Sequence, residues 1–94
     1  GELRKFGLMR KYYLKEYKRG IYSGLLLSGE LKKHLLMTQG QAEERFDLLV
    51  GQMAEREGVT EQLKAQDQML WVRRMNNVRA RAEEIVREEI IYCL

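Results

Sequence analysis

The chain has 94 residues, of which 45% are hydrophobic and 33% are charged, and its formal net charge is +3. This length suits one small domain, whose core is too small to enclose a large catalytic cavity. No apolar stretch is long enough to span a bilayer, and the first residues do not form a secretory leader. We therefore expect a cytoplasmic protein with no membrane partner. The single cysteine, Cys93, excludes an intrachain disulfide and a cysteine-based zinc cluster.

The charges are unevenly distributed along the chain. Residues 1–37 contain nine Lys or Arg and three acids, and residues 38–94 contain eight Lys or Arg and eleven acids. The first part is therefore basic and the second acidic. This pattern indicates either a surface that faces a polyanion or two parts that attract each other, within one chain or between chains.

The first half of the chain predicts three helices. Apolar residues between Leu3 and Tyr17 recur mostly at spacings of three and four, and Gly20 follows as a C-terminal cap. The leucine-rich segment 21–37 predicts a helix buried on several sides. Ser28 and Gly29 either break this helix or let another helix approach closely, and we favour a continuous or slightly kinked helix. Thr38 then predicts an N-cap for a helix that ends at Gly58.

The second half predicts one long helix from Thr60 almost to the end of the chain. Trp71, Met75, Val78 and Ala82 follow one another at spacings of four, three and four, which is typical of a heptad-like seam. About thirty helical residues make a rod of roughly 45 Å, longer than the other helices. We expect its far end to overhang and meet a second copy, as a homodimer through the C-terminal helix.

These patterns predict an all-α fold, a small bundle of about four helices with a long C-terminal helix. The predicted core residues are Phe6, Leu26, Leu31, Leu35, Phe46, Leu49, Met53, Trp71, Met75, Val78 and Ile85.

The residues available for chemistry argue against an enzyme. His34 is the only histidine, predicted in the last turn of a helix, and Cys93 is the only thiol. No phosphate-binding loop, dinucleotide-binding motif, zinc-protease motif or nucleophile elbow is present. Glutamate pairs at 43–44, 83–84 and 88–89 lack the histidine of carboxylate metal sites, and Arg81 and Arg87 are near enough to neutralise them. We predict no catalytic residue, no cofactor and no metal site. A metal-dependent enzyme using these glutamates is the weakest interpretation.

Nucleic-acid binding is the stronger hypothesis. Basic residues recur on one face of the first predicted helix, with tyrosines between them, and cations on a rigid element suit phosphate contacts. A second basic group, residues 73–81, surrounds Asn76 and Asn77, and Arg and Asn can read base edges. The alternatives are that the tyrosines complete the core and that the arginines pair with neighbouring glutamates. A helix-turn-helix fits poorly around Gly29 or Gly40. The candidate nucleic-acid-binding residues are Lys11, Lys15, Lys18, Arg19, Arg73, Arg74 and Asn77.

An ordered set of strings resembles a known family. It includes LLLSGEL at 25–31, GVTE at 58–61, MNN at 75–77 and EIIY at 89–92. Over residues 3–92 the chain resembles the transposon-encoded TnpV family of mobile elements in Gram-positive gut bacteria. Members commonly carry further residues before the first helix, so we expect a single helical domain, residues 1–94, that lacks this extension.

The resemblance implies a setting and no catalytic site. It implies an accessory protein encoded beside a site-specific recombinase, which binds DNA and assists recombination or excision. The alternative is a protein-interaction module that modulates a recombinase or inhibits a host defence nuclease.

Overall fold

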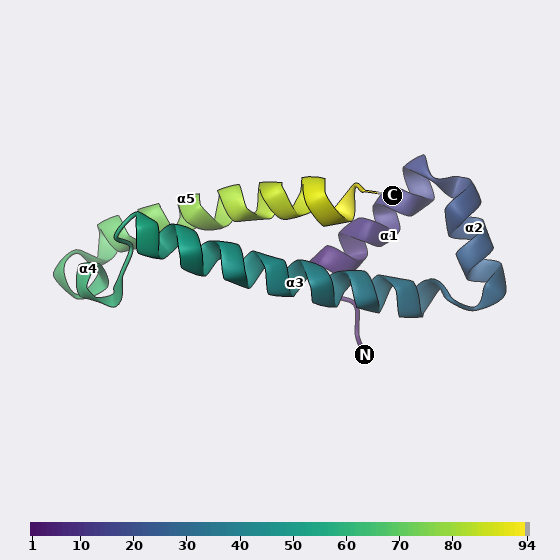
Figure 1. Cartoon of the computed structure of the whole chain (residues 1–94), viewed down its shortest axis with the longest axis horizontal. Helices are drawn as coiled ribbons and strands as arrows, with labels where there is room; N and C mark the ends of the chain where they lie inside the picture. Colours follow the sequence, from purple (N-terminus) through teal and green to yellow (C-terminus); the bar gives the residue numbers. More distant parts are fainter. Residues whose placement is uncertain (94) are drawn as a thin grey trace.

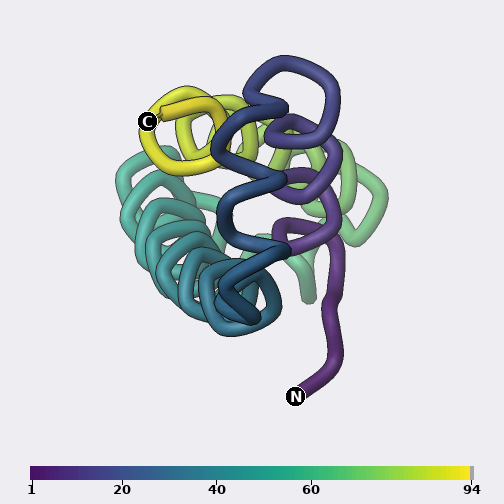
Figure 2. Tube along the Cα trace, turned by 90° about the vertical axis from the view of Figure 1, so that its right-hand side faces the viewer, coloured from purple at the N-terminus to yellow at the C-terminus, as the bar shows by residue number. Residues whose placement is uncertain are grey.

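The computed structural model describes residues 1–93, and every regular element among them is helical. The elements are α1 (Lys5–Tyr17), α2 (Arg19–Ser28), α3 (Leu31–Arg56), α4 (Glu61–Gln66), α5 (Gln68–Val86) and a π-helical turn, η1 (Arg87–Ile91). The all-α prediction is confirmed. The molecule measures 54 × 24 × 18 Å, and α3 and α5 run side by side along its long axis (Figure 1). Helix α1 packs against one half of this pair. Helix α2 lies at the end of the molecule that is nearer to α1, and α4 lies at the opposite end (Figures 1 and 2).

The core follows α3 from one end to the other. At its start, Leu31 and Leu35 pack with Leu14 of α1. Its middle packs with Phe6 of α1 and with α5 and η1, in a cluster formed by Phe6, Ala42, Leu49, Ala82, Val86 and Ile91. Its end packs with Val59 and Val78. Ten of the eleven predicted core residues are buried or packed against these clusters, because helical periodicity identifies the inward face of a helix well.

Leu26 is the core prediction that is wrong. The chain breaks at Gly29, whose φ of 78° lies in the left-handed region that favours glycine, and Glu30 donates its N–H to the Leu25 carbonyl at 2.9 Å. The expected continuous helix over 21–37 is therefore also wrong. Helix α2 has no fully buried residue, and Leu26 and Leu27 are 55% and 87% exposed. Its contacts with the rest of the core come from the partly buried Tyr22 and Leu25.

Two further predicted boundaries differ from the structure. Thr38 is not an N-cap, because α3 runs through it from Leu31 and the Thr38 side chain is buried. Gly20 is not the cap of the first helix, because α1 ends at Tyr17 and Gly20 lies inside α2. The break at Gly29 supplies the start of α3, and this leaves Thr38 inside that helix.

The predicted C-terminal helix is divided at Asp67. Thr60 does cap a helix, accepting the Leu63 N–H at 3.3 Å, but that helix is α4, with only six residues. Asp67 accepts the Leu70 N–H at 3.1 Å and begins α5. Helix α3, with 26 residues, is longer than α5, with 19, so the predicted order of lengths is wrong. The predicted seam is covered within the chain by α3, and the homodimer stays a prediction.

Gly7 of α1 lies directly against the Gln39 side chain of α3. A Cβ atom built on Gly7 would lie 2.5 Å from Oε1 of Gln39 and 2.9 Å from Cδ2 of Leu3. Gln39 is 2% exposed, accepts a hydrogen bond from the Arg4 N–H and donates one to the Glu2 carbonyl at 3.1 Å. The absence of a side chain at Gly7 therefore lets Gln39 hold the segment before α1 against α3.

We expect Gly7→Ala to destabilise the protein by about 1–3 kcal/mol, the usual cost of overpacking a filled site. This cost exceeds the gain of up to about 1 kcal/mol that alanine brings to a helix interior. Urea denaturation followed by circular dichroism measures the change. Gly40→Ala is the matched control, because among residues 1–93 nothing lies within 4 Å of its added Cβ. A stabilised Gly7→Ala protein would contradict the packing argument.

Candidate nucleic-acid interface

Four of the predicted DNA-binding cations gather where α1 passes into α2. Lys11 and Lys15 are four residues apart, which places them on one side of α1. Lys18 is the residue between α1 and α2, and Arg19 begins α2. Lys15 and Arg19 are exposed, and Lys11 and Lys18 are half-buried. Within residues 1–93 none of the four takes part in an ion pair. We call Lys11, Lys15, Lys18 and Arg19 the amino-end basic surface.

Lys32 extends this surface and was not predicted as a site residue. A cleft of about 470 Å³ between α1 and the start of α3 is lined by Lys11 and Lys32, by Gly1 and Glu2, and by the apolar Leu3, Leu31 and Leu35. Because α3 begins at Leu31, Lys32 lies in its first turn and comes near Lys11. Lys32 is one of the nine basic residues in the first part of the sequence, but only the start of α3 at Leu31 places it beside α1.

The acidic half of the chain pairs with other cations. Arg4 binds Glu43 at 2.8 Å, Lys5 pairs with Glu83, and Arg45 binds Glu89 at 3.1 Å. The hydrogen bond from Arg4, followed by its charge, lowers the pKa of the Glu43 carboxyl. The basic residues 1–37 and the acidic residues 38–94 therefore do attract each other. They do so through Arg4 and Lys5, where α1 begins, and not through the amino-end basic surface. These pairs are largely exposed and contribute little to stability.

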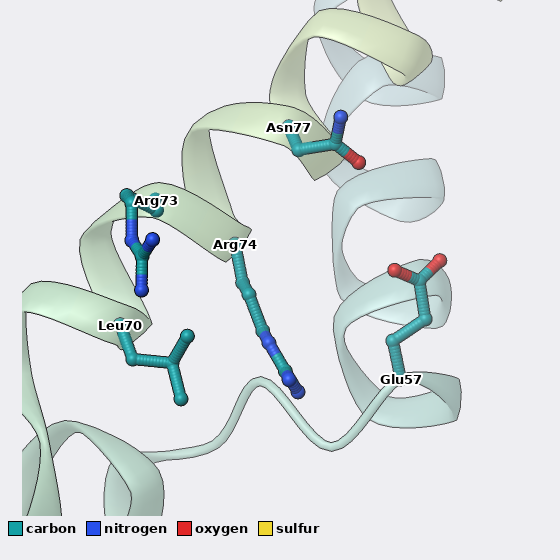
Figure 3. Close-up of a pocket in the computed structure, with 5 residues that line it drawn as sticks. All are labelled: Glu57, Leu70, Arg73, Arg74 and Asn77. Atoms are coloured by element: carbon teal, nitrogen blue, oxygen red, sulfur yellow. The ribbon is translucent and has the colours of Figure 1, made fainter.

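The second predicted group lies at the opposite end of the rod. Arg73, Arg74 and Asn77 project from α5 into an open pocket of about 410 Å³ that Leu70 and Glu57 also line (Figure 3). The structure brings these three predicted residues together. It does not bring them to the amino-end basic surface, because α5 begins beside α4 whereas α1 and α2 meet at the other end (Figure 1).

The carboxylate of Glu57 changes the character of this pocket. Arg81 donates to Glu57 at 2.6 Å and to Oδ1 of Asn77 at 2.9 Å. The hydrogen bond from Arg81 is the largest cause of the lowered pKa of Glu57, and the charges of Arg56 and Arg74 add to it. Arg81 therefore does not neutralise the glutamate pairs as expected, whereas Arg87 does contact Glu83, at 3.5 Å. Oδ1 of Asn77 already accepts the hydrogen bond from Arg81, a residue of the same helix.

The tyrosines divide into two kinds. Tyr22 and Tyr13 are partly buried and pack against the Leu14 cluster, as expected if they complete the core. Tyr12 and Tyr17 are 63% and 71% exposed and do not serve that purpose. The exposed pair shares α1 with the lysines, so aromatic and cationic side chains are available together at this end.

Arg10 connects distant segments of the fold, and the sequence did not predict this role. Its side chain is 6% exposed and donates to the carbonyls of Ile91, at 2.8 Å, and Cys93. It also donates to Nε2 of His34 at 3.3 Å. Its place between Phe6 and Leu14, four residues from each on the buried side of α1, was the available signal. Arg10 thus joins α1, α3 and the C-terminal end instead of facing solvent.

His34 lies in the first turn of α3, so its predicted place in the last turn of a helix is wrong. The break at Gly29 moves it there. Burial, followed by the charge of Arg10, lowers the pKa of the His34 imidazole. A neutral imidazole can accept the Arg10 hydrogen bond through Nε2, which agrees with that direction.

Comparison with known proteins identifies the family. The family described as transposon-encoded protein TnpV matches residues 1–91. The chain belongs to the TnpV family. It is therefore a transposon-associated protein. No curated protein and no solved structure gave a significant match.

The described part of this TnpV-family structure lacks two other kinds of feature, a metal-binding cluster and a membrane-spanning helix. Within residues 1–93 no group of three or more His, Cys, Asp or Glu side chains is placed to hold a metal ion. In the same part of the chain, none of the helices combines the length and the apolar character needed to cross a bilayer. The amino-end basic surface and the Arg73–Arg74 pocket carry the predicted cations, and Tyr12 and Tyr17 add exposed aromatic side chains.

Proposed function

We propose that this TnpV-family chain is a non-enzymatic DNA-binding accessory protein of its transposon. It binds the phosphate backbone through Lys11, Lys15, Lys18 and Arg19. The observation that carries this proposal is that these four cations have no ion-pair partner among residues 1–93, although acids elsewhere pair with five other Lys and Arg residues. Lys11, Lys15 and Arg19 lie in helices and Lys18 lies between two of them, so the backbone that carries these cations is already ordered when a phosphate binds.

The proposal predicts how strongly the affinity depends on salt. Each neutralised phosphate of B-DNA contributes about −0.9 to the slope of log K against log[salt]. Four contacts give a slope of about −3.6, which corresponds to a roughly 150-fold loss of affinity between about 50 and 200 mM salt. A contact from Lys32 would make the slope steeper by about 0.9.

Fluorescence anisotropy with a labelled duplex that carries the transposon's end sequence measures this slope. The expected result is measurable affinity at low salt and a slope near the value for four or five contacts. No binding at low salt, or an affinity that is independent of salt, would contradict the proposal. A scrambled duplex of equal length shows how much of the binding depends on sequence, which Arg73, Arg74 and Asn77 are the candidates to read.

Assistance in recombination or excision is the role that the family's setting favours. A protein that binds the transposon ends next to a recombinase can position them for synapsis. An excision assay in cells, with and without this gene, tests that role. Excision that is independent of the gene would leave DNA binding without a part in recombination.

A protein-interaction module is the second candidate, and the exposed apolar residues of α2 favour it. Ile21, Leu26 and Leu27 are 42%, 55% and 87% exposed, which is unusual for neighbouring large aliphatic residues. The partner would be the element's recombinase or a host defence nuclease. Size-exclusion chromatography of purified pairs, with Leu26→Ser/Leu27→Ser as the comparison, tests it. A complex that the double variant loses supports this candidate, and no complex with either partner contradicts it.

A further inference from the structure

Four tyrosines line one open cleft of about 340 Å³ beside the basic helix. Tyr12, Tyr13 and Tyr17 come from α1, and Tyr92 comes from the residue after η1. The Tyr13 ring lies at the centre of the group, 5.8 Å from the Tyr17 ring and 5.2 Å from the Tyr92 ring, between centroids. The cleft walls are therefore aromatic faces and edges drawn from both ends of the sequence.

Arg10 holds the two sides of the cleft, α1 and the segment around Tyr92, against each other. Arg10 donates to the carbonyls of Ile91 and Cys93, the two residues on either side of Tyr92. Its guanidinium also lies 5.8 Å from the centre of the Tyr13 ring. Tyr13 and Tyr17 are one helical turn apart on α1, which keeps their rings adjacent. A ligand therefore meets a site whose backbone is fixed before it binds.

Core packing does not account for this aromatic surface. Tyr12, Tyr17 and Tyr92 are 63%, 71% and 45% exposed, so much of each ring faces solvent. Flat, exposed aromatic walls suit a planar ring, and sites for single-stranded nucleic acid combine such walls with cations that follow the backbone. A cationic ligand is less well suited, because the Arg10 guanidinium already lies close to Tyr13.

We propose that the tyrosine cleft stacks an unpaired base of a DNA strand whose phosphates lie on the amino-end basic surface. This inference rests on the proposed function and adds a preference for single-stranded or opened DNA. Tyr12 follows Lys11 on α1, about 100° around the helix axis, so a strand that bends around α1 reaches both groups. Glu16, exposed on α1 next to Tyr17, repels phosphate from the aromatic side and leaves the neutral base to enter the cleft.

The test uses a fluorescein-labelled oligothymidylate of about twelve nucleotides, an abasic strand of equal length and a duplex of equal length, at one salt concentration. Stacking on aromatic side chains accounts for roughly ten- to hundredfold of single-strand affinity per base. We expect Tyr12→Ala/Tyr17→Ala to lose that factor for oligothymidylate and to change duplex affinity by less than about threefold. Tyr12→Phe/Tyr17→Phe keeps the rings and should keep the affinity. Leu8→Ala, an exposed apolar position on the same helix, is the matched control.

The outcomes distinguish a failure of base stacking from a failure of phosphate binding. Equal affinity for the abasic strand and oligothymidylate, or an equal loss in the Phe and Ala variants, overturns base stacking but leaves phosphate binding in place. A loss that the Leu8→Ala control shares also overturns it. If none of the three DNA probes binds the wild-type protein at low salt, the proposed function fails and this inference fails with it.

Discussion

Replacing Lys15 and Lys18 with glutamate is expected to weaken duplex binding roughly a hundredfold or more at low salt. The variant loses two phosphate contacts and places two anions where the DNA backbone would lie. The slope of log K against log[salt] should therefore become less steep by about 1.8. Within residues 1–93 neither lysine is in an ion pair, so the change breaks none. Anisotropy titrations of the wild-type and variant proteins across the same salt series measure both quantities.

The matched control reverses two exposed charges at the opposite end of the rod. Arg56→Glu/Arg79→Glu changes the net charge by the same amount, and both side chains are exposed. The decrease in log K for this control should be less than about a third of the decrease for Lys15→Glu/Lys18→Glu. Equal losses in the two variants would mean that binding follows net charge and has no defined surface. Circular dichroism verifies that both variants keep their helical content.

Arg10→Met is expected to lower the free energy of unfolding by about 2–3 kcal/mol. Methionine retains much of the aliphatic length of the side chain but donates no hydrogen bond. The carbonyls of Ile91 and Cys93 then lose their Arg10 donor, and His34 loses its contact as well. For a domain of this size the melting temperature should fall by about 8–24 °C. Thermal melts and urea titrations give the two values independently.

The control for Arg10 is Arg79→Met, which removes an exposed guanidinium from α5. Exposed substitutions of this kind usually change stability by about 0.5 kcal/mol or less. If Arg10→Met and Arg79→Met had the same stability as the wild-type protein, Arg10 would not fasten the C-terminal end to α1 and α3.

Helical periodicity predicted the inward faces of α1, α3 and α5 because each of these helices has one buried side. It failed for α2 because a dense run of leucines looks the same whether a helix is surrounded or lies at the end of the molecule. Leu27, at 87% exposure, shows the second case. The Ser28–Gly29 pair carried the correct signal, but only the left-handed backbone at Gly29 decides between a kink and a break.

The candidate site was predictable to the extent that it depends on one helix. The spacing of Lys11 and Lys15 places them together on α1, and Lys18 follows directly after that helix ends. Whether they are paired depends on contacts between distant segments, such as Arg4 with Glu43, which no local pattern encodes. Tyr92 joins the tyrosine cleft across 79 residues from Tyr13 for the same reason. Arg10 was the avoidable omission, since its place on the buried side of α1 could be read from the spacing.

The most direct test of the central claim is an NMR titration of the isotopically labelled protein with duplex DNA at low salt. It identifies the surface that the DNA contacts, residue by residue. The proposal predicts that amide shift changes concentrate in residues 11–19 and at the start of α3, around Lys32. Changes confined to the middle and end of α3, residues 44–56, or no changes at all, would contradict it.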